Sequence, residues 1–158
     1  MANARTPQPG LVEIWRINQR MNLRLLDALT DDQMAATILP RGRAVTSYFV
    51  HIHMARFYWL ERRAKTLAAK LKKIPGGTAP RGQLRQALID SSRAMEELFA
   101  EAERTGEIKG TKLGPMGFLG YALAHEAHHR GQILLHLRVA RLPVDRDTGY
   151  SLWYWTSV

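Results

Sequence analysis

Four long segments of this 158-residue chain carry apolar residues at three- and four-residue intervals, and Pro and Gly separate these segments. Such intervals place apolar side chains on one face of an α-helix. At 1.5 Å per residue, each segment would form a helix roughly 30–40 Å long. The pattern predicts an all-α four-helix bundle with long helices. The first, second and fourth expected helices cover residues 11–29, 44–73 and 115–141. The third is expected to begin after an N-cap at Thr78 and to end at Gly106.

Shorter signals lie between and after these helices. Thr30-Asp31-Asp32-Gln33 has the form of a capping box, which predicts a short helical turn before Pro40. Tyr150 to Trp155 is the one strand-like segment, and we expect it to form an aromatic arm over an open end of the bundle, with a pocket wall or a dimer contact as alternatives. We therefore expect one domain over residues 1–158, with residues 1–10 flexible and residues 143–158 forming a tail that packs on the bundle.

Composition excludes several classes of protein. The chain has no Cys, so thiolate nucleophiles, thiolate metal ligands and iron–sulfur clusters are excluded. Its net charge of +9 comes from basic residues spread along the chain without a nucleic-acid-binding motif, which predicts no specific nucleic-acid partner. No apolar run is long enough to span a membrane, and the first ten residues lack the apolar core of a secretory signal. We expect a cytoplasmic protein with no membrane partner.

Histidines are the main chemical signal, because the six in the chain fall on only two of the expected helices. His125 and His129 are four residues apart, so their side chains would stand one above the other on a helix and could hold one ion. A third His from the facing helix would complete a three-point site with room for water. Both His51 and His53 are available for this position, and helical periodicity alone favours His53.

A competing interpretation uses the same residues. His125-Glu126-Ala127-His128-His129 also spells His-Glu-x-x-His, the motif in which Glu acts as the general base of a zinc metallopeptidase. Such peptidases need a third ligand downstream, and no Glu follows Glu126, while Gln132 and Leu135 occupy the positions of the extended motif. A metallopeptidase is therefore a minor alternative.

Several motifs together resemble the DinB/YfiT-like family of metal-binding four-helix bundles. Residues 125–133 read His-Glu-Ala-His-His-Arg-Gly-Gln-Ile, which is similar to the family's pattern on its last helix. His51-Ile52 followed by Trp59-Leu60 resembles the pattern of its second helix. The Pro40-Arg41-Gly42-Arg43 segment and the closing Trp153-Tyr154-Trp155 are similar to one branch of the family.

The resemblance implies one divalent metal ion, nickel or zinc, held by His51, His125 and His129. It also implies a metal-dependent enzyme that acts on small molecules, as a hydrolase or as a transferase that uses a low-molecular-weight thiol. A non-catalytic metal-binding or ligand-binding stress-response protein is the alternative. Arg56, Arg130 and Gln132 are candidate anchors for an anion or substrate.

A homodimer is also expected. The chain carries four Trp and five Tyr, and one bundle need not bury all of its aromatic tail. The resemblance supports the same expectation, because similar bundles often pair.

Overall fold

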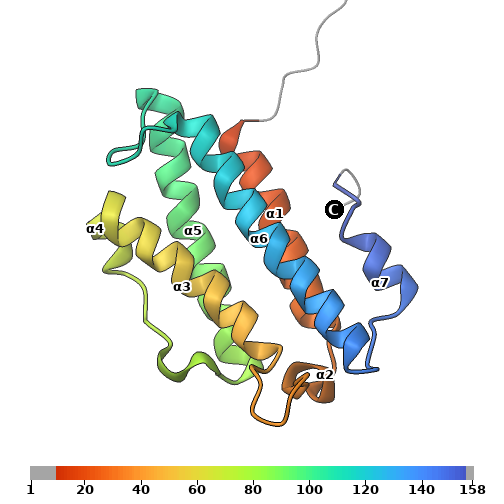
Figure 1. Ribbon diagram of the computed structural model, residues 1–158. Coiled ribbons are helices and arrows are strands. Elements are labelled where there is room, and N and C mark those ends of the chain that lie inside the picture. The colour runs from red at the N-terminus through yellow and green to blue at the C-terminus, as the bar shows by residue number, and fades with distance from the viewer. Residues whose placement is uncertain (1–9, 156–158) are drawn as a thin grey trace, which may run out of the picture.

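The computed structural model describes residues 10–155 and contains no strand within them. Four long helices form the bundle, and Figure 1 shows them running side by side with α7 beyond α6 and α1. The long helices are α1 (Leu11–Ala28), α3 (Thr46–Arg63), α5 (Arg81–Thr105) and α6 (Gly114–Val139). The shorter elements are α2 (Asp31–Ala35), α4 (Lys65–Ala68), the 3-10 turn η1 (Pro75–Gly77) and α7 (Arg146–Ser151). The predicted all-α four-helix bundle is therefore confirmed.

Local sequence signals explain several of the helix ends. The Thr30 hydroxyl accepts a hydrogen bond from the Gln33 N–H and the Gln33 side chain bonds the Thr30 N–H, so the predicted capping box begins α2. Gly106 ends α5 with φ of 78°, a left-handed conformation that glycine adopts without steric cost. Thr78, in contrast, is not the N-cap of α5, because the helix starts later and Pro80 occupies that position.

The expected helix over residues 44–73 is wrong in its second half. The backbone breaks at Ala64, where φ is −150°, and the short α4 follows. A continuous helix would place Lys72 roughly 28 Å from His53, whereas the Lys72 carbonyl oxygen lies 2.9 Å from Nε2 of His53. The chain therefore folds back along α3, and this return buries Ala68 and Ile74.

The expected strand-like segment at the C-terminus is also different. Residues Arg146–Ser151 form α7, and the Asp145 carboxylate begins this helix by accepting a hydrogen bond from the Thr148 N–H. Leu152 is buried against the bundle, while Trp153, Tyr154 and Trp155 stay exposed. The part of the tail within the described residues thus packs on the bundle through an aliphatic side chain; residues 1–9 and 156–158 lie outside the described residues.

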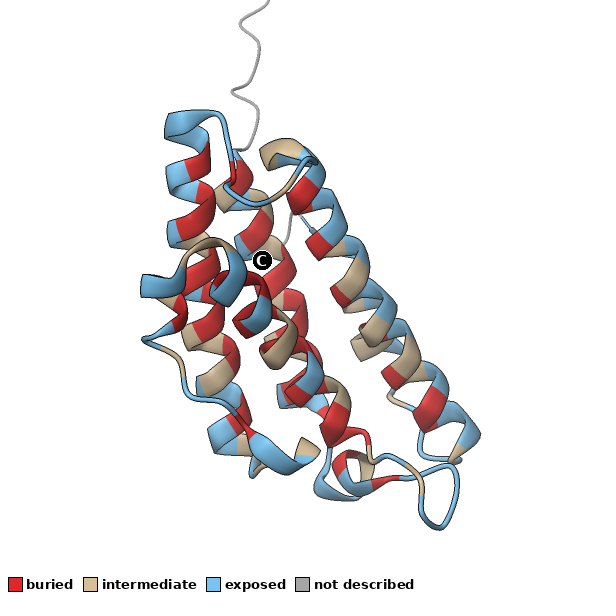
Figure 2. Ribbon diagram, turned by 60° about the vertical axis from the view of Figure 1, so that its left-hand side comes forward, coloured by how far each residue is buried: buried red, intermediate tan, exposed pale blue. Residues whose placement is uncertain are grey.

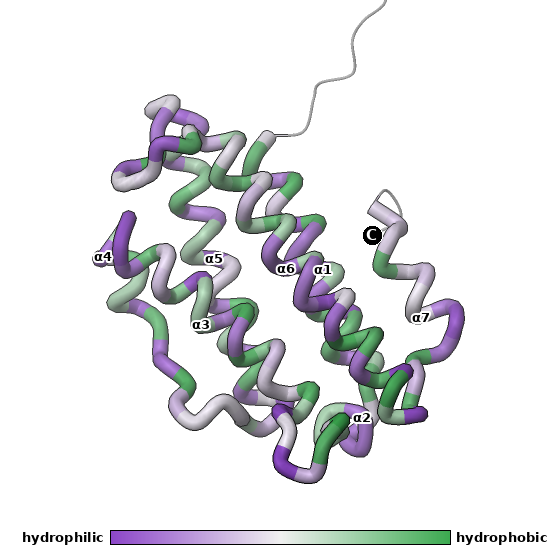
Figure 3. Tube along the Cα trace, viewed as in Figure 1, coloured by the Kyte–Doolittle hydropathy of each residue, from purple (hydrophilic) through white to green (hydrophobic). Residues whose placement is uncertain are grey.

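The interior consists of two hydrophobic clusters with a polar layer between them. Figure 2 shows buried residues as stripes along the long helices, and Figure 3 shows hydrophobic and hydrophilic positions alternating along the same helices. One cluster contains Met21, Phe49, Leu84, Ile133 and other residues near α2. The other contains Trp15, Leu60, Phe99, Phe118 and others toward the opposite end. The buried polar residues between them include Asn18 and Asn22 (α1), Arg56 (α3), Ser91 (α5), and Glu126 and Arg130 (α6).

Candidate metal centre

Three histidine side chains converge between α3 and α6. Nε2 of His125 lies 3.3 Å from Nε2 of His51 and 3.2 Å from Nε2 of His129. All three residues offer a nitrogen within 4.8 Å of the others. His51 is exposed and the other two are half-buried, so the cluster is open to solvent on one side.

The spacing of these nitrogens fits a tetrahedral metal ion. Imidazole nitrogens bind zinc at about 2.0–2.1 Å, so two such ligands of a tetrahedral ion are about 3.3–3.4 Å apart. The separations of Nε2 of His125 from Nε2 of His51 and of His129, 3.3 and 3.2 Å, are close to this value. Three neutral imidazoles are also a donor set that suits zinc and nickel. The side chains therefore fit a divalent ion.

The surroundings favour the neutral form of these imidazoles. Partial burial is the main cause that lowers the pKa of His125 to about 4, and His129 and His51 lower it further. Burial likewise lowers the pKa of His51 and of His129, although the hydrogen bond to Gln132 opposes the shift at His129. A neutral ring keeps a lone pair, which is the form that binds a metal ion.

Two neighbours fix the orientation of the rings. Nδ1 of His129 lies 2.7 Å from Oε1 of Gln132, an oxygen that only accepts, so Nδ1 carries the proton and Nε2 holds the lone pair that faces the cluster. Trp59 packs its ring against His125 with 5.1 Å between ring centroids. The sequence predicted Gln132 only as a substrate anchor, although its position three residues after His129 on one helix is a usable signal for this contact.

His53 does not join the cluster. Helical periodicity favoured it over His51, yet only 1% of its surface is exposed. Its two ring nitrogens lie 3.0 Å from the Ala87 carbonyl oxygen and 2.9 Å from that of Lys72. His53 therefore joins α3 to α5 and to the returning chain, while His51 lies beside His125 of α6.

Glu126 lies in the core and not at the histidine cluster. Its carboxylate accepts hydrogen bonds from Nε and Nη2 of Arg56 at 2.7 and 2.8 Å, and from Nδ2 of both Asn18 and Asn22 at 2.6 Å. Burial alone would raise the pKa of this carboxyl group, but Arg56 and the two Asn side chains outweigh burial and hold it below its ordinary value. A general base must reach the proton of a water near the ion, so the Glu role in the peptidase motif has no support here.

The two candidate arginine anchors belong to the same buried layer. Arg56 is fully buried against Glu126 and also donates to the Leu88 carbonyl oxygen at 3.0 Å. Nη1 of Arg130 donates to Oδ1 of Asn18 and of Asn22 at 2.8 and 2.7 Å. Neither guanidinium is placed to bind a substrate, because Arg130 joins α6 to α1 and Arg56 joins α3 to α6 and α5. In the sequence, Arg130 lies within the histidine motif and Arg56 lies three residues after His53, which made both of them candidate anchors.

The fold and the cluster together define a class: four-helix bundles in which facing helices bring three His side chains to one point. The sequence model of the DinB family matches residues 1–147 of this chain. The chain therefore belongs to the DinB family. No curated protein and no solved structure matches it. No helix within residues 10–155 is long and apolar enough to cross a lipid bilayer.

Proposed function

We propose that this DinB-family protein binds one divalent ion, zinc or nickel, through Nε2 of His51, His125 and His129. The convergence of the three nitrogens carries the proposal, because Nε2 of His125 lies 3.3 and 3.2 Å from Nε2 of His51 and of His129, which matches the spacing of ligands around one ion. The Gln132 contact supports it further, since metal-binding His residues almost always donate their other ring N–H to an acceptor.

The ion would keep an open coordination position. Among the described residues, the group of possible ligands contains these three His and no fourth. Glu126 is bonded within the core, and His128 lies on the exposed side of α6. Three protein ligands and an open position are typical of catalytic zinc sites. A divalent ion there would supply Lewis acidity, which lowers the pKa of water or of a thiol.

We further propose an enzyme that acts on small molecules, as a hydrolase or as a transferase that uses a low-molecular-weight thiol. A cavity of about 450 Å³ has His51 in its wall, together with Arg43 and Lys73, and this volume suits a small molecule. The open side of the cluster is bordered by Tyr48 and Tyr121, whose rings lie 6.3 Å from His129 and His125 respectively. These aromatic groups could contact a substrate at the ion.

Metal content of purified variants tests the ligand set. The protein should bind one zinc or nickel ion per chain, and His51→Ala, His125→Ala and His129→Ala should each lose stoichiometric metal while circular dichroism still shows a helical fold. His128→Ala is the matched control, because its ring lies beside His129 but outside the cluster. Full occupancy in the three ligand variants would refute the site.

Cobalt substitution separates the enzyme from the non-catalytic alternative. With cobalt in the site, a small thiol such as 2-mercaptoethanol should change the visible absorption spectrum, because it enters the open position. A spectrum that no thiol or small anion changes would support a closed, non-catalytic metal-binding protein in place of the enzyme.

A further inference from the structure

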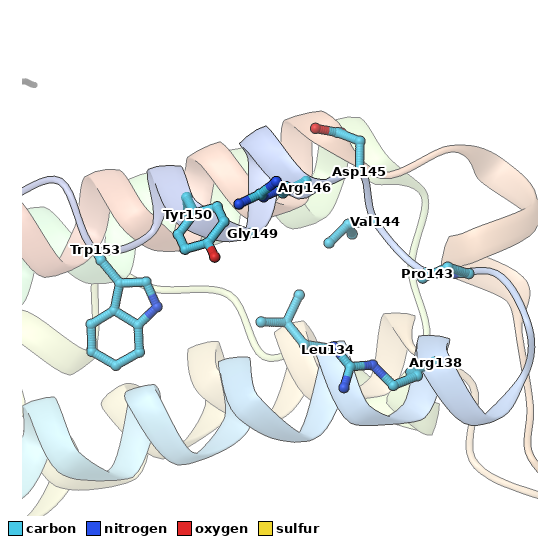
Figure 4. Close-up of a pocket in the computed structure, with 9 residues that line it drawn as sticks. All are labelled: Leu134, Arg138, Pro143, Val144, Asp145, Arg146, Gly149, Tyr150 and Trp153. Atoms are coloured by element: carbon cyan, nitrogen blue, oxygen red, sulfur yellow. The ribbon is translucent and has the colours of Figure 1, made fainter.

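A second cavity lies between α6 and the segment that contains α7. It is open to solvent, and its volume of about 470 Å³ is within the range of small-molecule sites. Figure 4 shows Leu134 and Arg138 on the α6 side, with Arg146 and Tyr150 on the opposite side and Trp153 at one end. We refer to this cavity as the α6–α7 cleft.

The α6–α7 cleft is separate from the histidine cluster. Leu134 follows His129 by five residues and Arg138 follows it by nine, which correspond to rotations of roughly 140° and 180° around the helix. The two cleft residues therefore lie on the side of α6 that faces away from the cluster. A ligand in the cleft would not contact the metal ligands, and an inference about it does not depend on the proposed metal site.

The wall formed by α7 is tied to the bundle at several points. Leu152 is buried in the core, and Nη1 of Arg24 on α1 donates to the Ser151 carbonyl oxygen at 2.9 Å. Nε2 of Gln33 donates to the carbonyl oxygens of Leu142 and Pro143 at 3.0 and 3.2 Å. The contacts at both ends of the segment hold α7 at a fixed place beside α6.

The charges in the cleft favour an anion. Arg138 and Arg146 reach it from opposite walls, and within residues 10–155 neither guanidinium forms a salt bridge. Asp145 also lines the cleft, but its two oxygens accept hydrogen bonds from the Thr148 N–H at 2.8 Å and from the Thr148 hydroxyl at 2.6 Å. Guanidinium groups bind carboxylates and phosphates through paired N–H donors.

The apolar part of the lining favours a flat ring. The Trp153 side chain is 78% exposed and Tyr150 is 51% exposed, which are high values for large aromatic residues. The Arg146 guanidinium lies 5.3 Å from the centre of the Tyr150 ring, so it holds a cation–π position beside the open space. Indole and phenol rings contribute large contact areas when they stack on a planar ligand.

We propose that the α6–α7 cleft is a second ligand site that binds a small planar aromatic anion. The ring lies against Trp153 and Tyr150, and the carboxylate or phosphate group binds between Arg138 and Arg146. The ligand joins α6 to the C-terminal segment and covers apolar surface that is exposed without it.

Calorimetric titration of the full chain tests this site with 2-naphthoate as the probe. Two related compounds separate the contributions: 2-naphthamide keeps the rings without the charge, and acetate keeps the charge without the rings. Binding of 2-naphthoate should be at least tenfold tighter than that of either compound. Phenyl phosphate, titrated in parallel, shows which acidic group the two guanidinium groups prefer.

Variants locate the binding. Arg138→Gln and Arg146→Gln should each weaken 2-naphthoate binding about tenfold or more, and Trp153→Leu should weaken it as well. Arg93→Gln is the matched control, because Arg93 is an exposed arginine on α5 outside the cleft. His125→Ala should leave the binding unchanged, which separates this site from the metal centre. Absence of binding, equal binding of 2-naphthamide, or unchanged affinity in both arginine variants would overturn the proposal.

Discussion

Replacing Glu126 by Gln removes one negative charge from the polar layer and keeps the shape of the side chain. The native carboxylate accepts four hydrogen bonds and pairs with Arg56, and the side chains of both partners are fully buried. Gln has one oxygen acceptor where the carboxylate has two. Its amide N–H group would face N–H donors of the surrounding Asn and Arg side chains. Arg56 and the largely buried Arg130 would then lack any buried counter-charge among the described residues.

Removing one partner of a buried ion pair costs about 3–5 kcal/mol, because the remaining charge stays desolvated. Native domains are stable by about 5–15 kcal/mol, so Glu126→Gln should remove a large share of the free energy of unfolding. For a chain of this size, the same loss lowers Tm by roughly 6–20 °C. Glu97→Gln is the matched control; it breaks the exposed pair with Lys70, which we expect to be worth about 0–1 kcal/mol.

Urea unfolding followed by circular dichroism, with a chelator present, measures both variants without a contribution from bound metal. Adding Arg56→Met to Glu126→Gln should recover part of the stability, because it removes the unpaired cation. A loss below about 1 kcal/mol for Glu126→Gln would refute the view that this charge holds the polar layer together.

Four further predictions follow from other contacts. Gln132→Leu should weaken metal binding about 10- to 100-fold, because Nδ1–H of His129 loses its acceptor. A competition titration against a chelator measures this loss, and a metal affinity equal to that of the native protein would contradict it. His53→Ala should lower stability in urea but keep one metal ion per chain, so loss of metal would indicate that His53 is a ligand. The metal-free protein should lose stability as pH falls from 6.5 to about 4. In this range the unfolded chain protonates His125 near its ordinary pKa, whereas the folded chain does so only near pH 4. Urea unfolding at several pH values should therefore show a smaller loss of stability for His125→Ala. Sedimentation should give a dimer of twice the 18.0 kDa chain mass, with exposed α6 residues such as Leu135 and Val139 as candidate contacts, whereas a monomer at tens of micromolar would contradict this.

Most of the fold was predictable from local patterns. Apolar periodicity and helix-ending residues identified the four long helices, and the Thr30 capping box predicted α2. The break at Ala64 was not predictable, because no Pro or Gly marks it. It depends on tertiary contacts: the chain folds back so that the Lys72 carbonyl oxygen meets His53.

Only the part of the candidate site that depends on residue spacing within one helix was predictable from the sequence. Four-residue spacing placed His125 and His129 together, and the family resemblance selected His51 over His53. The roles of Glu126 and Arg56 depend on partners far along the chain, 108 residues in the case of the Asn18–Glu126 contact. Local spacing therefore marked these residues as candidates for chemistry, whereas the structure shows that they form the buried support of the bundle.

Anomalous diffraction from crystals grown with zinc or nickel would show whether the three histidines hold one metal ion. We predict one peak about 2.0–2.1 Å from Nε2 of His51, His125 and His129, with a non-protein ligand at a further position. A crystal without a peak at this cluster, or with the ion on His53 or His128 instead, would contradict it.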